Sequence, residues 1–376
     1  MVTVQEISER RDIKKFINFA NDLYKDNPYY VPDMFSSQVN DFDREKNPAF
    51  EYCDAKCFLA YRDGKILGRI AAIYNTHANQ KYNLSQMRFS HADYIDDDEV
   101  VDALFAAVEN WAKEKGCTAV HGPLGFSDMD REGLLIKGFD CLSQFFVYYN
   151  HPYYMQQMER MGYGKDVDWI EYRITLPEKP DERLDRLANT VSRRMKLTPV
   201  PLTDRNSIKP HIEDVFKLYN EAYLALYGMV ALTPRQVEKY VGEFLPLVDE
   251  RSTALLRNEK GELVAFGVAA PSLSRAQQKN RGRLFPFGWY HILRALNGKN
   301  DTMDLFLIAV RPDLQGTGIN AVIMNRLLKF AIEDGVKYAE TGPELEYNTH
   351  VQSQWRYFDT VQHKTRRCFI KYFNKQ

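Results

Sequence analysis

The stretch from Asp304 to Ala331 constrains the fold more than any other part of the sequence. It opens with a continuous apolar run, Leu305 to Val310, whose length suits a β-strand. A turn with two glycines follows, and apolar residues then recur at helical spacing from Ile319 onward. The sequence therefore predicts a strand, a glycine turn and a helix in direct succession.

The glycine turn is suited to binding phosphate. Its sequence is Gln315-Gly316-Thr317-Gly318-Ile319-Asn320. Glycines leave consecutive backbone N–H groups uncovered, and the first turn of the following helix adds unpaired donors and a positive dipole end. Neither nucleotide fingerprint fits, because a P-loop needs Lys-Ser/Thr after the second glycine and a dinucleotide fold needs GxGxxG. A plain strand-to-helix turn is the alternative interpretation of these residues alone.

Length, charge and cysteine content limit the class of protein. The chain has 376 residues, of which 44% are hydrophobic, and this length suggests about two to three domains. Its net charge of −1 argues against general nucleic-acid binding. The five cysteines are scattered, so we expect reduced thiols and neither a disulfide framework nor a metal site. With no signal peptide and no long uncharged apolar run, we expect a cytoplasmic protein.

One order of elements occurs twice along the chain. The first copy has a hairpin at 57–73, a helix at 99–115, a strand at 117–120 and Gly122-Pro123; the second has a hairpin at 252–269, the glycine turn with its helix, a strand at 336–340 and Gly342-Pro343. We interpret this order as an internal duplication, with modules at 1–176 and 184–376 joined by a polar linker at 177–183. Coincidence of common α/β parts is the alternative.

The two copies differ just before their long helices. The first copy has Tyr94-Ile-Asp-Asp-Asp-Glu99 in place of a glycine turn. Carboxylates at this position stabilise a helix N-terminus, but they would repel a diphosphate. We therefore expect only the second copy to bind a phosphate-bearing ligand.

The residues from Val310 to Ile319 resemble the acyl-CoA loop of the GNAT (Gcn5-related N-acetyltransferase) superfamily, whose usual form is Gln/Arg-x-x-Gly-x-Gly/Ala. Asn320 stands where that loop usually has its last small residue. Further matches over nearly the whole chain resemble a bacterial family of two-module GNAT-like proteins; among them are Asn27-Pro28-Tyr29-x-Val31-Pro32, Gly68-Arg69-Ile70-Ala71-Ala72, Gly122-Pro123-x-x-Phe126-Ser127, Gly282 to Trp289 and Glu346-x-Asn348-Thr349. The resemblance implies an α/β fold of two tandem GNAT-like modules, mixed sheets flanked by helices, with the first module degenerate.

The same resemblance implies an acyl-CoA-dependent N-acyltransferase that uses acetyl-CoA or a longer acyl-CoA and no metal. In this superfamily the pantetheine arm lies between two splayed parallel strands, and backbone N–H groups of the first strand stabilise the oxyanion. The residues that match these roles are Ile308, Ala309 and Val310 on the strand and Gln315, Gly316, Thr317, Gly318, Ile319 and Asn320 in the loop. Some bacterial ceramide synthases resemble related GNAT enzymes, so the expected acceptor is a small-molecule amine or a lipid or sphingoid amine.

N-acyl transfer needs a base that takes the amine proton. After the second strand of the C-terminal half the chain offers Glu340, Glu344 and Glu346, of which the first and third fall on the family's pattern. Asn348 either orients the substrate or caps the helix that follows. For Glu340 and Glu346 a solvated surface position is the alternative. Tyr357 is a candidate acid for the leaving thiolate, but packing in the core is the expected role.

In the N-terminal half, Ser127 and Glu132 lie in a polar loop near His121 and Asp128. Polar loops after strand ends are where α/β folds place ligands, so Ser127 and Glu132 are candidate acceptor contacts. No GxSxG elbow accompanies them. Capping of the loop is the alternative.

The segment 275–300 contains six basic residues and no acidic one. Phe285, Phe287 and Trp289 lie among these charges, a composition typical of a membrane interface or of a cover for an acyl chain. The segment therefore predicts contact with the acceptor lipid and peripheral association with the inner membrane. A helix whose apolar side completes the core is the alternative.

Two rival classes of function stay open beside N-acyl transfer. One is a non-catalytic protein that senses acyl-CoA or serves as a scaffold. The other is a relative that transfers amino acids from aminoacyl-tRNA, against which the near-neutral charge counts.

Overall fold

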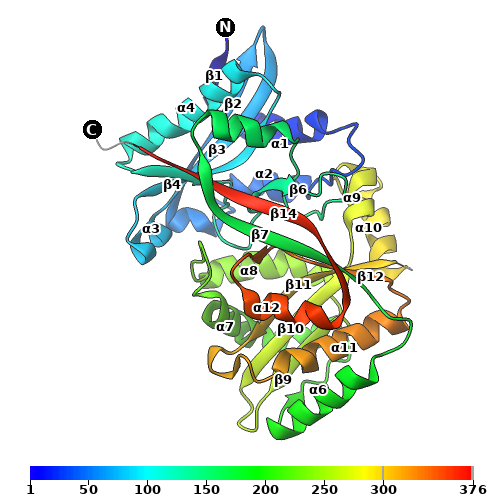
Figure 1. Cartoon of the computed structure of the whole chain (residues 1–376). Coiled ribbons are helices and arrows are strands. Elements are labelled where there is room, and N and C mark those ends of the chain that lie inside the picture. Colours follow the sequence, from blue (N-terminus) through cyan, green and yellow to red (C-terminus); the bar gives the residue numbers. More distant parts are fainter. Residues whose placement is uncertain (299, 374–376) are drawn as a thin grey trace. The chain divides into compact units, whose positions relative to one another are not determined.

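The computed structural model describes residues 1–298 and 300–373 (Figure 1). The chain forms two compact units, each made of separate stretches of sequence. Unit 1 comprises Met1–Trp169, Ser274–His291 and the described residues from Lys364 onward, and unit 2 comprises Ile170–Leu273 and the described part of Ile292–His363. Each unit is a mixed sheet flanked by helices, which confirms the predicted α/β class.

Unit 1 has its strands in the order β1-β2-β3-β4-β5-β14. These strands are β1 (Thr3–Ile7), β2 (Cys53–Arg62), β3 (Lys65–Asn75), β4 (Gln86–Tyr94), β5 (Ala119–Gly122) and the part of β14 (Asp359–Tyr372) from Lys364 onward, with β6 (Leu134–Lys137) beside β14. The helices are α1 (Arg10–Leu23), α2 (Phe35–Asp41), η1 (Pro48–Glu51), α3 (Thr76–Tyr82), α4 (Asp98–Glu114), α5 (Tyr153–Arg160), α9 (Ser274–Asn280) and the start of α10 (Gly288–Asn297). β4 and β5 run parallel, and the other neighbouring strands of this order run antiparallel.

Unit 2 has its strands in the order β8-β9-β10-β11-β12-β7. These strands are β8 (Thr198–Pro199), β9 (Thr253–Arg257), β10 (Leu263–Pro271), β11 (Thr302–Val310), β12 (Tyr338–Thr341) and β7 (Gly164–Thr175), with β13 (Glu344–Leu345) after β12. The helices are α6 (Glu182–Arg194), η2 (Arg205–His211), α7 (Ile212–Tyr223), α8 (Pro234–Phe244), η3 (Leu245–Leu247), η4 (Pro312–Leu314), α11 (Ile319–Glu333), α12 (Thr349–Ser353) and η5 (Gln354–Tyr357). Here β11 and β12 are the parallel pair.

The two sheets repeat one topology, which confirms the internal duplication. In each unit an antiparallel hairpin is followed by a third antiparallel strand, a long helix and a parallel strand. In unit 1 the third strand and the helix are β4 and α4, and in unit 2 they are β11 and α11. The parallel strand then has an antiparallel neighbour, β14 in unit 1 and β7 in unit 2.

That last strand comes from the other half of the sequence in both units. The segment of β14 beside β5 lies near the end of the chain, whereas the segment of β7 beside β12 precedes the linker predicted at 177–183. The compact units are therefore discontinuous along the chain, whereas the predicted modules 1–176 and 184–376 describe the repeat along the sequence. The residues 182–183 at the end of that linker already belong to α6.

The long helices explain why each unit folds as it does. On α4, Val100, Leu104 and Val108 recur at helical spacing and are fully buried against the sheet of unit 1. On α11, Ile323 and Leu327 bury the corresponding stripe against β9 and β10 in unit 2. Full burial of such a side chain contributes about 1.5–3 kcal/mol, so these stripes hold each helix on its sheet.

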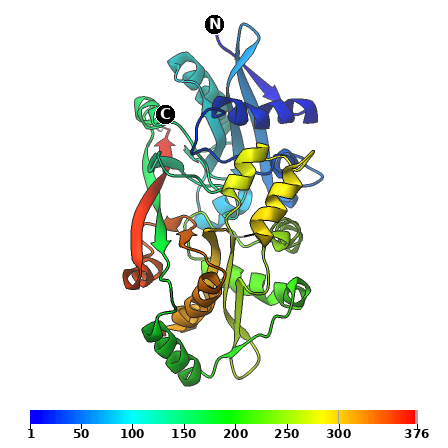
Figure 2. The same cartoon turned by 90° about the vertical axis from the view of Figure 1, so that its right-hand side faces the viewer.

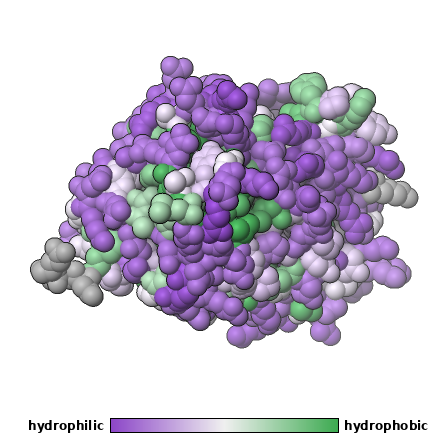
Figure 3. Space-filling model, turned by 90° about the horizontal axis from the view of Figure 1, so that it is seen from above, coloured by the Kyte–Doolittle hydropathy of each residue, from purple (hydrophilic) through white to green (hydrophobic). Residues whose placement is uncertain are grey.

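The five cysteines are free, and all except the partly buried Cys141 are buried. This agrees with the expectation of reduced thiols. No helix within residues 1–298 and 300–373 combines the length and the apolar character that crossing a bilayer requires. The face of the molecule in Figure 3 is largely hydrophilic, with apolar side chains in separate patches.

Candidate functional site

The parallel ladder of unit 2 covers only the first part of β11. The described pairing between β11 and β12 ends at Leu305 and Thr341. Next to this end the register between β10 and β11 shifts, so that Phe306 is the extra residue of a β-bulge. The predicted residues Ile308, Ala309 and Val310 lie on β11 beyond that ladder.

The backbone of this part of β11 is held in place by neighbouring side chains. The Tyr223 hydroxyl donates to the Ile308 carbonyl at 3.0 Å, and the Gln315 amide donates to the Val310 carbonyl at 3.3 Å. Ala309 and Val310 are themselves buried. Backbone dipoles fixed before a reaction begins are what stabilisation of an oxyanion requires.

The glycine turn closes on itself and leaves one side open. Gly316 (φ 76°) and Gly318 (φ 92°) both adopt the left-handed conformation that favours glycine. The Thr317 hydroxyl donates to the Leu314 carbonyl at 2.6 Å and so fixes the turn. A Cβ on Gly316 would meet no atom within 4 Å, whereas one on Gly318 would lie 3.2 Å from Val191. The open side is therefore the Gly316 side.

The start of α11 offers unused donors. Gly318 is the N-cap, no side chain caps the helix, and no acidic residue lies in its first turn. Within the described residues, the N–H groups of Gly316 and Gly318 donate no hydrogen bond. Arg194 of α6 donates to the Thr317 carbonyl at 2.7 Å and brings positive charge beside the turn. Such a set of N–H groups, with the helix dipole behind it, fits a diphosphate.

Glu340 lies within the sheet of unit 2 and is 8% exposed. On the neighbouring strands its register partners are Asp304 of β11 and Arg173 of β7. Directly opposite residues of neighbouring strands share one face of a sheet. Glu340 therefore lies in a row with Asp304 and Arg173 across three neighbouring strands.

Glu346 and Asn348 lie between β13 and α12. Glu346 is partly exposed, and its backbone carbonyl accepts from the Gln352 side chain at 3.2 Å. Asn348 is the N-cap residue of α12, but its side chain forms no capping hydrogen bond. The capping interpretation was wrong because the backbone there (φ −79°, ψ 63°) is outside the extended conformation of a capping residue.

The expected core packing of Tyr357 was also wrong. The side chain is 84% exposed. The η5 turn that carries it buries Trp355 instead, at 4% exposure. One turn of this length places one aromatic residue in the core and directs the other outward.

Glu344 was named among the acids after the second strand, but it was not chosen as the base. The Trp355 indole N–H donates to both of its carboxyl oxygens, at 2.9 and 3.1 Å. Burial raises the pKa of Glu344 to about 8, although the Trp355 hydrogen bond acts in the opposite direction. A carboxyl group with this pKa exchanges protons near neutral pH. The sequence feature that could have identified Glu344 is Gly342-Pro343, because it places this residue directly after a strand end.

The N-terminal candidates form a closed loop in unit 1. The Ser127 N–H donates to the Asp130 carboxylate at 3.1 Å, and the Ser127 hydroxyl accepts from the Met129 N–H at 3.3 Å. These contacts support the capping interpretation of Ser127. Burial, followed by the charge of Asp128, raises the pKa of Glu132 well above its ordinary value.

His121 lies in a cluster with Asp166 and Cys368. Its Nδ1 lies 3.5 Å from an Asp166 oxygen, and the potential ligand atoms of His121, Asp166 and Cys368 all lie within 4.8 Å of one another. Burial lowers the pKa of His121, although the hydrogen bond to Asp166 acts in the opposite direction. The expectation of a metal-free protein stays a prediction.

The aromatic residues of the basic segment are exposed in unit 1. Phe285 is 79% exposed, Phe287 70% and Trp289 46%. They lie between α9 and the first turn of α10, the two helices coloured yellow in Figure 2. These three side chains are therefore not part of the core, contrary to the alternative in which the apolar side of the segment completes it.

Hydrogen bonds hold this segment to the first part of the chain. The Phe35 N–H donates to the Gly282 carbonyl at 2.8 Å, and the Gln278 amide donates to the Tyr30 carbonyl at 2.9 Å. Arg281 pairs with Asp22 at 2.8 Å. Part of the positive charge is thus used within unit 1, and Lys299 lies outside the described residues.

Comparisons with known proteins agree with this architecture. Residues 212–354 match the model of the acetyltransferase (GNAT) family. Protein YghO of Escherichia coli (strain K12) is 28% identical over 330 residues, which cover 87% of this chain and 83% of that protein. A bacterial ceramide synthase of Caulobacter vibrioides is 24% identical over 305 residues, which cover 79% and 77% of the two chains.

A solved structure shares the fold over the whole length. It is a tandem GNAT protein from the clavulanic acid biosynthesis pathway, matched with a TM-score of 0.59 over 100% of both chains at 9% sequence identity. The repeated sheet and the glycine turn before α11 agree with a tandem GNAT fold. The chain is thus similar in sequence to two bacterial proteins over most of its length, and residues 212–354 carry the match to the GNAT family.

Proposed function

We propose that this protein transfers an acyl group from an acyl-CoA thioester to the amine of a long-chain acceptor. One observation carries the proposal: the glycine turn at the uncapped start of α11, next to the end of the parallel ladder in unit 2. GNAT proteins generally use an acyl-CoA as co-substrate. The predicted set from Ile308 to Val310 and from Gln315 to Asn320 would hold it.

The diphosphate of CoA would lie against the N–H groups of Gly316 and Gly318 and the first turn of α11. Arg194, through its contact with the Thr317 carbonyl, supplies a positive charge nearby. Asn320 is larger than the residue usual in this loop, but it is the second residue of α11. The open space at Gly316 supports an approach of the phosphates from that side.

The reaction needs few groups. The neutral amine attacks the thioester carbonyl, the C–N bond forms, and the C–S bond breaks as the thiolate leaves and takes up a proton. Backbone N–H groups of Ile308 to Val310 would stabilise the oxyanion. For the base we favour Glu344 over the predicted Glu340 and Glu346, since its pKa of about 8 suits transfer of an amine proton at neutral pH.

Two observations favour a lipid amine as the acceptor. The Caulobacter relative is a ceramide synthase by name. Unit 1 exposes Phe285, Phe287 and Trp289, and aromatic side chains beside basic ones suit the interface of a membrane. Peripheral contact with a membrane would bring a long-chain amine to the enzyme without a membrane-spanning helix.

The decisive experiment incubates the purified protein with palmitoyl-CoA and an amine, and measures the N-acyl product by mass spectrometry. We expect product with the long-chain amine sphinganine and at least tenfold less with ethanolamine, because each buried CH₂ contributes about 0.8 kcal/mol. Binding of palmitoyl-CoA without product from any amine would favour the acyl-CoA sensor instead. Product only with an aminoacyl-tRNA donor would favour the third class.

A further inference from the structure

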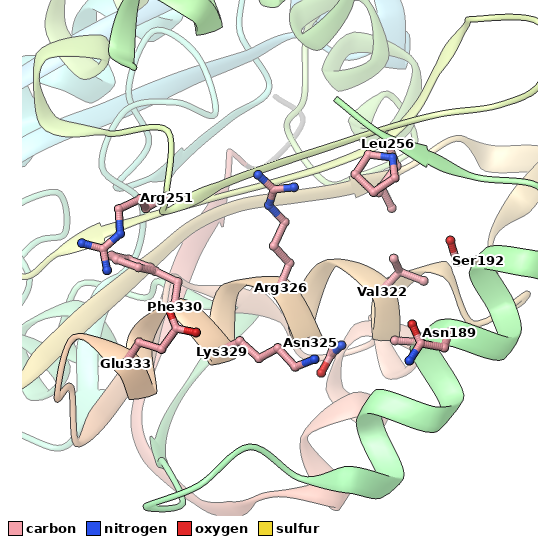
Figure 4. Close-up of a pocket in the computed structure, with 12 residues that line it drawn as sticks. Asn189, Ser192, Arg251, Leu256, Val322, Asn325, Arg326, Lys329, Phe330 and Glu333 are labelled. Atoms are coloured by element: carbon pink, nitrogen blue, oxygen red, sulfur yellow. The ribbon is translucent and has the colours of Figure 1, made fainter. Parts of the chain in front are cut away.

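A cavity of about 400 Å³ lies in unit 2 between α6, α11 and the strand β9 (Figure 4). Its lining residues are Ala188, Asn189 and Ser192 of α6, Pro199 of β8, Arg251, Leu256 of β9, and Val322, Asn325, Arg326, Lys329, Phe330 and Glu333 of α11. None of these described residues belongs to the candidate acyl-CoA site. The volume falls within the range of small-molecule sites in proteins.

Three basic side chains line the cavity, and two of them have partners in the fold. Arg251 pairs with Asp334 at 3.0 Å and lies over the Phe330 ring, 4.5 Å from its centre. Lys329 pairs with Asp185. The charges of Arg251 and Lys329 are therefore paired within the fold.

Arg326 differs from both. It forms no hydrogen bond or ion pair with any residue in the described ranges, 1–298 and 300–373. Burial lowers the pKa of its guanidinium, and no neighbouring carboxylate opposes the shift. Figure 4 shows its side chain extending from α11 toward the strands, across the cavity. A cation removed from water without a counter-charge costs free energy, and a bound anion would recover part of that cost.

The walls of the cavity combine apolar and polar surface. Leu256 and Phe330 are buried apolar residues, and Val322 lies on the same helix as Phe330, two turns earlier. Asn189 and Ser192 add polar groups from α6. Glu333 carries the only carboxylate among the lining residues, and it is exposed to solvent. The lining thus suits a ligand with an apolar body and a negative group.

We propose that this cavity binds an organic anion, a carboxylate or a phosphate monoester, whose charged group pairs with Arg326 and whose apolar body contacts Leu256, Val322 and Phe330. The guanidinium fork matches both kinds of anion in a bidentate geometry. A bound ligand adds a contact between α6 and α11, because both helices line the cavity. The site does not depend on the proposed acyltransferase function.

Calorimetric titration with simple probes tests the proposal. Phenyl phosphate and benzoate present the two anions on an apolar body, inorganic phosphate presents the charge alone, and phenol presents the apolar body alone. Phenyl phosphate or benzoate should bind wild type at least tenfold more tightly than inorganic phosphate or phenol does. Arg326→Gln should lose about 10–100-fold in affinity for the binding probe, the value of a hydrogen bond to a charged group.

Matched variants separate this cavity from other sites. Arg186→Gln removes the same charge from the exposed side of α6 and should leave binding unchanged. Asn189→Trp should fill the cavity and weaken binding, which tests the location by a second route if Arg326→Gln folds poorly. Gly316→Asp, in the acyl-CoA turn, should not affect the probe.

Two results would overturn the site. One is the absence of binding to wild type of both organic anions up to about 10 mM, where any specific site of useful affinity would be filled. The other is a loss of probe binding in Gly316→Asp while Arg326→Gln retains it, which would assign the probe to the glycine turn. Both results can be interpreted even if the protein does not turn over palmitoyl-CoA, because the probes contain no CoA.

Discussion

Helices α4 and α11 occupy the same place in two copies of one topology, yet they begin in opposite ways. The Asp97 side chain caps α4 by accepting from the Val100 N–H, and Asp98 and Glu99 lie in its first turn. Arg62 pairs with Asp97 at 2.7 Å and with Glu99 at 2.8 Å. The glycine-led start of α11 has neither a cap nor an acidic residue.

Under the proposed function, the same position of one fold serves stability in one copy and binding in the other. A side-chain cap stabilises a helix by about 1 kcal/mol because it satisfies an N–H group that would otherwise need water. The N-terminus of α4 is therefore capped by a side chain of the protein itself. The start of α11 lacks that stabilisation, and in the proposed function its donors bind the diphosphate. Four predictions test this division between the copies.

The largest effect is expected at the acids that follow the two parallel strands. Glu344→Gln should lower kcat by about 10²–10⁴-fold, the usual contribution of a general base. Wild-type activity should rise with pH until Glu344 loses its proton, near pH 8, and this rise should be absent in the variant. Activity is measured with palmitoyl-CoA and sphinganine.

The matched controls for this prediction are Glu346→Gln in unit 2 and Glu132→Gln in unit 1. Both should stay within about threefold of wild type, well below the loss expected of a base. Stability gives an independent readout, because burial raises the pKa of Glu344 in the folded protein. The stability from its protonated form is complete below the ordinary glutamate pKa and is lost as pH rises through about 8. A full loss of activity in Glu132→Gln would move the base to unit 1.

The second effect concerns the glycine turn itself. Palmitoyl-CoA at about 100 times its Kd should stabilise wild type by about 2.7 kcal/mol, and Gly316→Asp should abolish this stabilisation by placing a carboxylate against the diphosphate. Thermal melts with and without ligand measure the shift. Gly261→Asp is the control, since Gly261 has nearly the same backbone conformation (φ 78°) and equal open space around it. Equal shifts in both variants would remove the turn from the site.

The third prediction concerns membrane binding by the exposed aromatic residues of unit 1. Phe285→Ser combined with Trp289→Ser should reduce sedimentation with anionic liposomes about tenfold, because both side chains are exposed and apolar. The same variant should retain the thermal shift with palmitoyl-CoA. As a control, Tyr357→Ser removes an exposed aromatic residue of unit 2 and should sediment like wild type. If wild type does not sediment with anionic liposomes at low salt, the membrane proposal is wrong.

The smallest effect is expected at the capped helix. Asp97→Ala removes the cap of α4 and one partner of Arg62, and should lower the free energy of unfolding by about 0.5–2 kcal/mol. It should not create CoA binding, because Asp98 and Glu99 remain in the first turn. Urea titration followed by circular dichroism measures the loss. Unchanged stability, or a new thermal shift with palmitoyl-CoA, would contradict the comparison.

The elements that carry strong apolar periodicity were predictable from the sequence. The hairpin at 57–73, the long helices at 99–115 and from Ile319, and the strand from Leu305 were all expected close to where they occur. The β4 strand was not, because its sequence is interrupted by polar residues such as Asp93. The structure shows why these are tolerated: Asp93 and Arg69 form a fully buried ion pair at 2.6 Å. Pairing offsets part of the cost of burying the two charges, so a strand with polar residues can lie in the core.

The candidate site divides in the same way. The glycine turn could be located because glycine at a left-handed position leaves a mark in the sequence. The choice among Glu340, Glu344 and Glu346 could not be made, because it depends on what lies beside each carboxyl. Only the fold brings Trp355 to Glu344 and places Arg173 opposite Glu340. Helix α6, with the cavity that it lines, was missed because few of its residues are buried.

The strand β14 has a consequence for how the chain is made. Its segment beside β5 completes the sheet of unit 1, whose other strands come from the first half of the sequence. On the ribosome the N-terminal half therefore emerges with an unpaired edge at β5 and must wait until nearly all of unit 2 has been synthesised. An unpaired edge is a site of aggregation, so the nascent chain is most vulnerable during that interval. Neither half of the gene could be lost or transferred by itself without leaving a sheet open.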